Sequence, residues 1–358
     1  MSPADLADVI GAIYTYLMNG YSPDMNWAGL FQPGETVRLR VINASAMSNF
    51  DVRIPGLDMD VVMADGKAVK PARVHEFRIG VAETYDVLVR PELDRPFTLF
   101  AESLDRSGYA RGTLTPKAGL EAPVPQMRRT PVRKLDDIGM GMMAEGIFGG
   151  MDHGENGDDP MDHGGAMEEG GSMARPDPQI FGPNGPEPFR PDREGSASVA
   201  MIIPNPSYRM DEPGIGLGDD GWRVLTYDDL VADEPQPYRE APDREMTINI
   251  TANMERYMFS FDGLKFTEHP APYLFRHNER LRLFLVNHTM MEHPIHLHGM
   301  WMQPENGADR LPFKHTVLVK PGEVLTALII PIEKGDWAFH CHLLYHMEAG
   351  MFQVVRVA

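Results

Sequence analysis

Alternation of apolar and polar residues predicts β-strands in two stretches of the chain. In the first stretch the clearest case is Val37-Arg38-Leu39-Arg40-Val41, where every second residue is apolar, as in a strand with one buried face. A turn signal, Pro33-Gly34-Glu35, precedes it. Four further segments are predicted as strands: Phe50–Ile54, His75–Ile79, Tyr85–Val89 and Phe97–Phe100. Short strands with frequent turns predict an all-β sandwich or barrel that ends near Thr115, after a connecting segment of weak helical character over residues 1–18.

The second stretch begins near Val224 and has the same character. Its predicted strands are Met246–Ile250, Leu281–Val286, Thr316–Val319, Leu325–Ile330, Trp337–His342 and Phe352–Val357. Together the two stretches predict an all-β protein with two sandwich or barrel domains, over residues 1–115 and 206–358.

The two stretches also resemble each other in sequence. Residues 30–43, which end in Asn43, parallel residues 274–287, which end in Asn287. Beyond each asparagine the copies differ, because the second continues to three histidines, His293, His296 and His298. The first copy has Asn49 or Phe50, Val52 or Arg53, and Ile54 or Pro55 at these positions, depending on a one-residue choice of alignment. The first domain is therefore predicted to be a scaffold without metal ligands.

Residues 116–205 interrupt the β pattern. Pro, Gly, Met and acidic residues dominate this segment, and Met-Asp-His-Gly occurs twice, at 151–154 and 161–164. We predict a disordered linker without a packed core. One interpretation is a low-complexity connection; the other is collection of Cu(I), which thioethers prefer. The candidate residues for collection are Met140, Met142, Met143, Met151, His153, Met161, His163, Met167 and Met173.

Composition narrows the classes of function. The 358 residues are 42% hydrophobic, which is ordinary for a chain that buries a core, and the formal net charge of -19 argues against nucleic acid and anionic membranes as partners. One cysteine excludes an internal disulfide. No apolar run reaches the length of a membrane span. Residues 2–18 carry no Lys or Arg, so they do not form a secretory signal peptide.

That single cysteine lies in a segment dense in metal ligands. Cys341 is flanked by His340 and His342, and His346 and Met351 follow. On a strand, successive side chains point to opposite faces, so Cys341 points one way and its two flanking histidines the other. One strand would then serve two metal centres, with Cys341 as the bridge between them. Two imidazoles, a thiolate and a weak axial thioether are the ligands of a blue-copper site.

The histidines at 293, 296 and 298 also divide between the two predicted metal centres. His296 and His298 share one face of a strand and would meet His340 and His342, which makes half of a multi-copper cluster. His293 would join Cys341, His346 and Met351 as the electron-entry copper site. Pro294 fixes the backbone between His293 and His296, and Gly299 permits close approach of neighbouring backbone.

Two other interpretations of these residues are weaker. A lone buried cysteine usually acts as a small hydrophobic side chain. This interpretation does not explain why three histidines and Met351 lie within the same twelve residues as Cys341. Zinc also binds Cys and His, but a structural zinc site needs no Met351 and leaves four histidines unused.

These motifs resemble those of the multicopper oxidases, and among them the bacterial copper-resistance proteins of the CopA type. The segments His293–Gly299 and His340–Met351 match the two C-terminal copper motifs of that family, and the Met-Asp-His-Gly repeats point to the copper-resistance branch. The likeness extends to residues 14–20, 50–56, 83–87 and 311–317.

The resemblance implies cupredoxin-type Greek-key domains, a periplasmic location, copper as cofactor and reduction of O2 to water. It implies oxidation of Cu(I), with phenols as incidental substrates. It implies type 1 ligands at His293, Cys341, His346 and Met351, a type 2 ligand at His296, and type 3 ligands at His298, His340 and His342. Electrons would pass through Cys341 and the flanking His340 and His342, the residues expected to carry the catalysis.

The family pattern is incomplete in this chain. The family uses eight histidines for its trinuclear cluster, four of them from an N-terminal domain, whereas the histidines before residue 269 are His75, His153 and His163. We therefore expect that a first cupredoxin domain and its signal peptide are absent and that activity needs this domain in the same or another chain. The alternative is a periplasmic copper-binding or electron-transfer protein with a type 1 site only.

Overall fold

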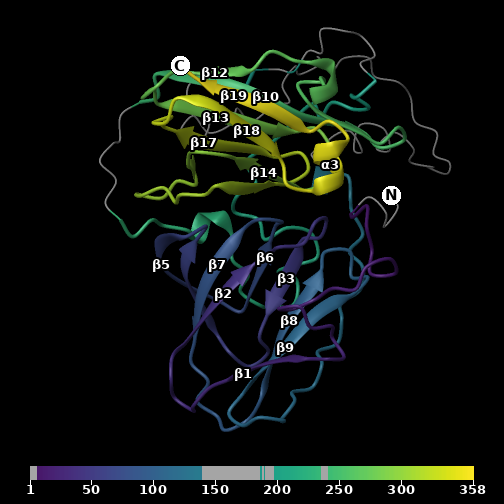
Figure 1. Cartoon of the computed structure of the whole chain (residues 1–358), viewed down its shortest axis with the longest axis vertical. Coiled ribbons are helices and arrows are strands. Elements are labelled where there is room, and N and C mark those ends of the chain that lie inside the picture. Colours follow the sequence, from purple (N-terminus) through teal and green to yellow (C-terminus); the bar gives the residue numbers. More distant parts are fainter. Residues whose placement is uncertain (1–5, 139–185, 188, 190–196, 235–240) are drawn as a thin grey trace, which may run out of the picture.

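Two β-units are stacked along the long axis of the molecule (Figure 1). The structure is a computed structural model that describes residues 6–138, 186–187, 189, 197–234 and 241–358. The candidate copper-collecting residues between Met140 and Met173 lie outside the described residues.

The N-terminal β-unit contains a five-stranded sheet of order β1-β9-β8-β3-β6 and a four-stranded sheet of order β2-β7-β4-β5. The strands are β1 (Trp27–Leu30), β2 (Val37–Ile42), β3 (Phe50–Arg53), β4 (Met59–Ala64), β5 (Lys67–Val74), β6 (Glu76–Ile79), β7 (Thr84–Val89), β8 (Phe97–Ser103) and β9 (Tyr109–Thr115). Alternate side chains of β7 are buried, so Tyr85, Val87 and Val89 enter the core between the two sheets.

The C-terminal β-unit contains two five-stranded sheets, of order β11-β10-β13-β17-β15 and β12-β19-β18-β14-β16. The strands are β10 (Arg244–Asn253), β11 (Met258–Phe261), β12 (Tyr273–Phe275), β13 (Leu281–Asn287), β14 (His293–Leu297), β15 (Met302–Pro304), β16 (Thr316–Val319), β17 (Val324–Ile329), β18 (Gly335–Cys341) and β19 (Phe352–Val357). The short helix α3 (Leu344–Glu348) follows β18, and the described residues also form the 3-10 turns η2 (Asp136–Ile138), η3 (Tyr227–Asp229) and η4 (Phe266–Glu268). The predicted all-β class is confirmed.

The two units repeat one architecture. β1 pairs in parallel with β9, as β12 does with β19, and β2 pairs antiparallel with β7, as β13 does with β17. The asparagine that ends each sequence repeat has the same role. Nδ2 of Asn43 donates to the carbonyls of Ser48 and Ile79, and Nδ2 of Asn287 donates to those of Met291 and Val319.

This repeat decides the alignment that the sequence leaves open. Because Ile79 and Val319 are equivalent, their strand partners Phe50 and His293 are equivalent too. Arg53 then takes the place of His296, and Pro55 that of His298. The strand pairs Val52–Ala101 and Ile295–Cys341 make Ala101 equivalent to Cys341.

Some local structure differs from the sequence-based expectation. Residues 116–138, predicted as the start of an unpacked linker, lie along the N-terminal β-unit: Thr98 Oγ1 donates to the Pro123 carbonyl at 2.7 Å, and Ile138 is buried. Residues 6–18 form turns and extended backbone without a helix, and Leu6, Val9 and Tyr16 are buried.

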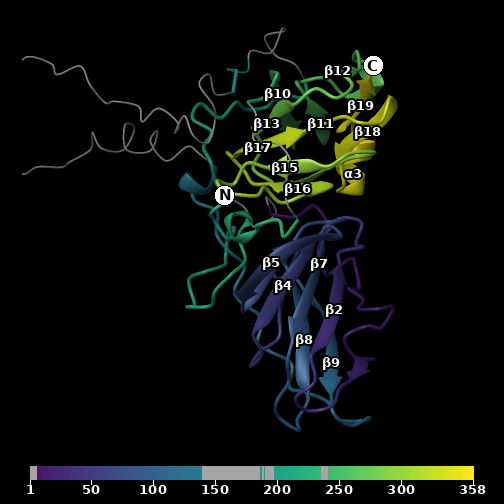
Figure 2. The same cartoon turned by 90° about the vertical axis from the view of Figure 1, so that its left-hand side faces the viewer.

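Residues 197–234 run between the two β-units (Figure 2, teal). Leu225 N donates to the Glu76 carbonyl, and Nδ2 of Asn306 donates to the Tyr227 carbonyl, so this segment is bonded to both units.

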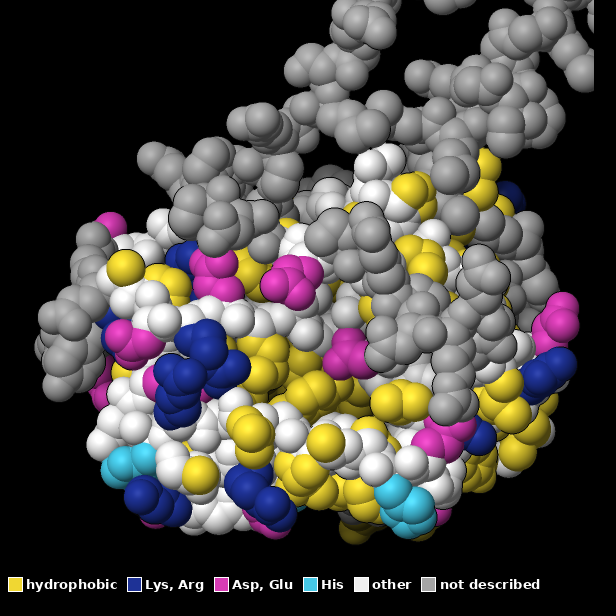
Figure 3. All heavy atoms as spheres, turned by 90° about the horizontal axis from the view of Figure 1, so that it is seen from above, with side chains coloured by type: hydrophobic (Ala, Val, Ile, Leu, Met, Phe, Trp, Pro, Cys, Tyr) yellow, Lys and Arg dark blue, Asp and Glu magenta, His cyan; other side chains and the backbone are white. Residues whose placement is uncertain are grey.

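No helix in the described part of the chain is long and apolar enough to cross a membrane. Seen from the C-terminal end, hydrophobic side chains line a hollow that is bordered by both acidic and basic groups (Figure 3).

Candidate metal centre

Three buried side chains converge at one end of the C-terminal β-unit. Cys341 Sγ lies 3.6 Å from Nδ1 of His293 and 3.8 Å from Nδ1 of His346, and the two Nδ1 atoms are 3.2 Å apart. His293 begins β14, Cys341 ends β18 and His346 lies on α3. All three side chains are fully buried. The structure therefore brings together three of the four residues expected at the type 1 site.

The hydrogen bonds on the far side of each ring fix its tautomer. The hydroxyl of Thr289 donates to the Met291 carbonyl, so Thr289 Oγ1 accepts the Nε2–H of His293 at 2.7 Å. Nε2–H of His346 donates to Oδ2 of Asp8 at 2.5 Å. Each Nδ1 then carries a lone pair, and two unprotonated nitrogens 3.2 Å apart can bind one cation that lies to the side of the line joining them.

The triangle of atoms fits a metal ion. A point equidistant from the three atoms lies about 2.1 Å from each, within the range of about 2.0–2.3 Å at which nitrogen and sulfur bind first-row metal ions. The ligand atoms of these three side chains all lie within 4.8 Å of one another, close enough to share one ion. A trigonal set of two imidazoles and a thiolate favours copper.

Met351 is held next to this trio by its backbone. Its N–H donates to the His346 carbonyl at 2.9 Å, and its carbonyl accepts from Cys341 N at 3.1 Å. The side chain is fully buried. The ring of Phe259 is stacked on that of His346, with 3.7 Å between the centroids. These contacts exclude water from the group.

Burial also sets the protonation of the trio. It lowers the pKa of His293, with the neighbouring His346 and Arg133 as lesser causes, and it lowers the pKa of His346 in spite of Asp8. Burial raises the pKa of the Cys341 thiol. Both imidazoles are therefore neutral and able to bind a metal, and a bound cation would favour the thiolate form of Cys341.

The opposite face of β18 contributes to a second group of histidines. β14 and β18 are paired, with Ile295 opposite Cys341 and His296 opposite His340. The ring centroids of His296 lie 4.5 Å from those of His298 and 5.7 Å from those of His340 and His342. All four residues expected on this face are therefore neighbours.

Two of these rings direct an Nε2 lone pair into the group. Nδ1–H of His296 donates to the His315 carbonyl at 2.7 Å, and Nδ1–H of His340 donates to the Cys341 carbonyl at 2.9 Å. Nε2 of His340 lies 3.1 Å from Nε2 of His298. Burial lowers the pKa of His296 to about 3 and also lowers those of His340 and His342. Each of these neutral rings has one nitrogen lone pair that can bind a metal ion, and the group is open to solvent because His298 is exposed.

Close packing supports this second group. Gly299 has φ +74°, a conformation that favours glycine, and a Cβ there would lie 2.4 Å from the ring of Trp337. Gly299 was expected to permit close approach of neighbouring backbone, and the group that approaches it is instead the side chain of Trp337.

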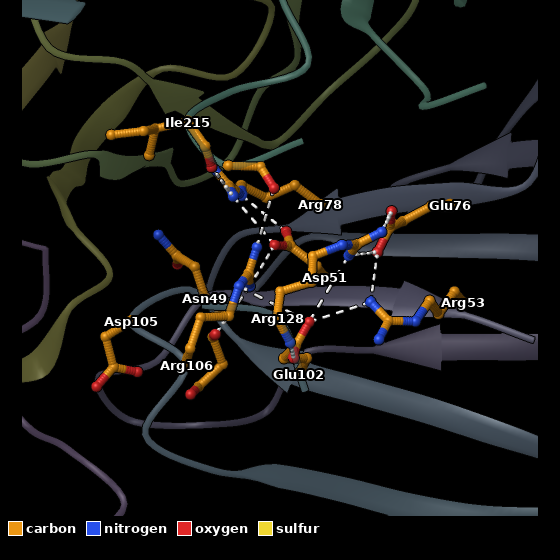
Figure 4. A network of polar contacts seen from close by, with 12 residues as sticks. Asn49, Asp51, Arg53, Glu76, Arg78, Glu102, Asp105, Arg106, Arg128 and Ile215 are labelled. Carbon is orange, nitrogen blue, oxygen red and sulfur yellow. Dashed lines mark hydrogen bonds and ion pairs between the residues drawn. The ribbon is translucent and has the colours of Figure 1, made fainter. Parts of the chain in front are cut away.

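The equivalent positions of the N-terminal β-unit hold ion pairs instead. Nη1 of Arg53, which replaces His296, lies 3.0 Å from Glu102 and 3.3 Å from Glu76. Arg78 makes paired bonds to Asp51, and Arg106 also contacts Asp51 (Figure 4). Burial would raise the pKa of Asp51, but Arg78 and Arg106 hold it below its usual range. Ion pairs thus compensate the buried charges on this side of the unit.

Three residues at the site could not be found from sequence spacing. Asp8 lies more than 330 residues before its partner His346. Arg78 of the N-terminal β-unit contacts Glu292, the neighbour of His293, at 2.7 Å. His315 adjoins the second histidine group, with 5.2 Å between its ring centroid and that of His296; it lies just before β16, inside the segment 311–317 that shares the family likeness.

Comparison with known proteins identifies the family of this chain. The multicopper oxidase family matches residues 2–118 and 239–358. The chain belongs to the multicopper oxidase family, a family of copper-binding oxidoreductases, which confirms the resemblance seen in the motifs.

Relatives include proteins of copper resistance. The chain is 46% identical to Copper resistance protein A of Escherichia coli, over 100% of this chain and 61% of that protein. It is 46% identical to a Copper resistance protein A homolog of Pseudomonas syringae pv. tomato, over 100% of this chain and 60% of that protein. The chain thus spans about three fifths of the length of these relatives.

Solved structures share the fold. A laccase-like multi-copper oxidase from Ochrobactrum sp. superposes with a TM-score of 0.56 at 16% identity, over 97% of this chain and 60% of that chain. Fet3p, a multicopper oxidase that functions in iron import, gives a TM-score of 0.54 at 14% identity, over 93% and 57%.

Proposed function

We propose that this chain is the copper-binding part of a copper-resistance oxidase that oxidises Cu(I), and incidentally phenols, with O2 as acceptor. The proposed division is a scaffold over residues 1–115, a linker over 116–205 and the metal-binding domain over 206–358. The proposed location is the periplasm, by analogy with the copper-resistance relatives.

The observation that carries this proposal is the division of ligands across β18. Cys341 faces His293 and His346, while His340 and His342 face His296 and His298. We assign the first set, with Met351, to a type 1 copper and the second to half of a trinuclear cluster. Copper bound at the first set would supply a one-electron acceptor.

The roles of the residues follow from their positions. Cys341 links the two groups through its own backbone, because His340 and His342 are its covalent neighbours. Asp8 and Thr289 orient the two imidazoles beside Cys341. For each O2 reduced to two waters, four cuprous ions are oxidised and four protons are taken up. The other cluster ligands would come from a domain outside this chain.

Copper stoichiometry and oxygen uptake test the proposal together. Protein loaded with Cu(I) without oxygen, then washed with a Cu(I) chelator, should retain about one copper per chain at the trigonal site. Addition of the N-terminal domain of a relative should raise this to about four and start O2 uptake coupled to Cu(I) oxidation. His293→Gln should abolish the uptake.

A second candidate is an electron-transfer protein with a type 1 site only. The exposure of His298 favours it for the isolated chain, because an open group of four histidines is an incomplete cluster. A blue protein that exchanges electrons but consumes no oxygen, even with the added domain, would establish this candidate and overturn the oxidase proposal.

A further inference from the structure

The turn between β4 and β5 of the N-terminal β-unit reaches into the C-terminal β-unit beside the histidine group. Its first residue, Asp65, has φ +46° and is 3% exposed. A buried carboxylate is costly unless it is bonded on all sides, so its partners indicate what holds it there.

The two oxygens of Asp65 bind different β-units. Oδ1 accepts from Thr84 N at 2.9 Å, within the N-terminal unit. Oδ2 accepts from the backbone N–H groups of His315 and Thr316, at 3.0 and 3.2 Å. The carboxylate therefore fixes the backbone at the start of β16 relative to the neighbouring unit.

This backbone is the partner of a proposed copper ligand. The carbonyl of His315 accepts the Nδ1–H of His296 at 2.7 Å, and Thr316 Oγ1 lies 3.1 Å from the same nitrogen. Thr316 is also the strand partner of His296. A carbonyl can only accept, so its position decides that Nδ1 carries the proton and that Nε2 keeps its lone pair.

Lys314 neutralises the carboxylate. Its Nζ lies 3.1 Å from Oδ2 of Asp65 and 2.8 Å from Oε1 of Glu83. Burial would lower the pKa of Lys314, but Asp65 and Glu83 raise it, so the ammonium stays charged. Oε1 of Glu83 accepts a bond from the Tyr227 hydroxyl at 2.6 Å and Oε2 accepts one from Gly80 N at 2.7 Å, so its carboxylate binds groups other than the backbone of residues 315 and 316.

We infer that Asp65 is a positioning residue of the scaffold unit that sets the tautomer and orientation of His296 through the backbone of His315 and Thr316. The N-terminal β-unit would then prepare a metal ligand in the other unit without touching the metal. The inference rests on the proposed function only in treating His296 as a ligand.

The test measures the tautomer in metal-free protein, separately from activity. Long-range 1H–15N correlation of 15N-histidine-labelled chain reports which imidazole nitrogen carries the proton, with the His296 signals assigned by His296→Gln. Wild type should show only the Nδ1–H form for His296. Asp65→Asn keeps the turn and leaves the Lys314–Glu83 pair intact, and it should give a mixture of the two tautomers.

Copper binding provides the second measurement. In Asp65→Asn, the Cu(II) affinity of the four-histidine group should fall about tenfold or more, while the blue absorption of the Cys341 site is unchanged. Glu83→Gln is the matched control, because it removes the other partner of Lys314 and should preserve the His296 tautomer.

Two outcomes would overturn the inference: a wild-type tautomer and affinity in Asp65→Asn, or the same changes in Glu83→Gln. If Asp65→Asn does not fold, Asp65→Glu serves, since the extra methylene displaces the carboxylate from both N–H groups and should have the same effect. A chain that shows the tautomer change but never consumes O2 would support this inference and contradict only the proposed function.

Discussion

Oδ2 of Asp8 lies 2.5 Å from Nε2 of His346, although 338 residues separate them in sequence. The carboxylate also accepts a bond from the hydroxyl of Tyr257 at 3.2 Å. A carboxylate behind a metal-binding imidazole orients the ring and makes it a stronger ligand. The first residues of the described chain thus belong to the proposed type 1 site, close to α3 (Figure 1).

Removal of this carboxylate should weaken metal binding. Asp8→Ala frees the His346 ring, and we expect copper affinity at the trigonal site to fall about 10- to 100-fold. Titration of the blue absorption against a competing chelator measures the change. Asp94→Ala, at an exposed acidic residue of the N-terminal β-unit, is the control and should bind as wild type. Equal affinity in both variants would contradict the role of Asp8.

Substitution of the cysteine should separate the two metal groups. Cys341→Ser removes the thiolate, so the blue absorption should disappear, while Cu(II) binding to His296, His298, His340 and His342 should persist because these rings lie on the other face of β18. Electron paramagnetic resonance of the Cu(II)-loaded variant distinguishes the sites. His342→Gln should have the reverse effect, and loss of both signals in both variants would argue against two separate groups.

The ion-pair network of the N-terminal β-unit should dominate its stability. Arg78 contacts Asp51 and Glu292, and all three side chains are buried. Arg78→Met leaves both carboxylates without this partner and should lower the free energy of unfolding by about 3–5 kcal/mol. Urea unfolding measures the loss. Arg73→Met, which breaks the exposed pair with Asp60, is the control and should change stability little.

The metal-free chain should lose stability as the pH falls below about 6.5, the ordinary pKa of histidine. Burial lowers the folded-state pKa of His293 and His346, and lowers that of His296 to about 3. Between these values and 6.5 the unfolded chain binds more protons than the folded chain, so stability declines with falling pH.

Thermal unfolding between pH 8 and pH 4.5 tests this dependence. The decline should be smaller in His293→Gln, which has one buried imidazole fewer to protonate. Copper loading should move the decline to lower pH, because protons and the metal compete for the same lone pairs. An identical pH profile for wild type and His293→Gln would contradict the assignment of buried neutral imidazole to His293.

Local sequence patterns were sufficient to predict the all-β fold class and the placement of Cys341 and its two flanking histidines on opposite faces of β18. The alternation of Val37–Val41 became β2 with every second residue exposed, and the two-residue spacing of His340 and His342 placed them together. Strands with weaker alternation, such as β4 and β5, were not predicted. Their pairing within the sheet, of β4 with β7 and of β5 with β4, determines these strands rather than their own pattern.

Contacts between distant segments were beyond the sequence. Asp8, Asp65 and Arg78 are ordinary acidic or basic residues in their local context, and only the stacking of the two β-units brings them to His346, His315 and Glu292. The one-residue ambiguity between Val52 and Arg53 was likewise decided by strand pairing and by the bonds of Asn43 and Asn287.

The replacement of histidines by Arg53 and Glu102 in the N-terminal β-unit has a consequence for the order of assembly. Arg53 and Glu102 pair with each other inside this unit, so we expect the unit to reach its native state without metal. Copper binding at the proposed sites of the C-terminal β-unit would then follow the folding of the N-terminal β-unit, and we expect the copper supply to set the amount of metal-loaded protein rather than the amount of folded protein.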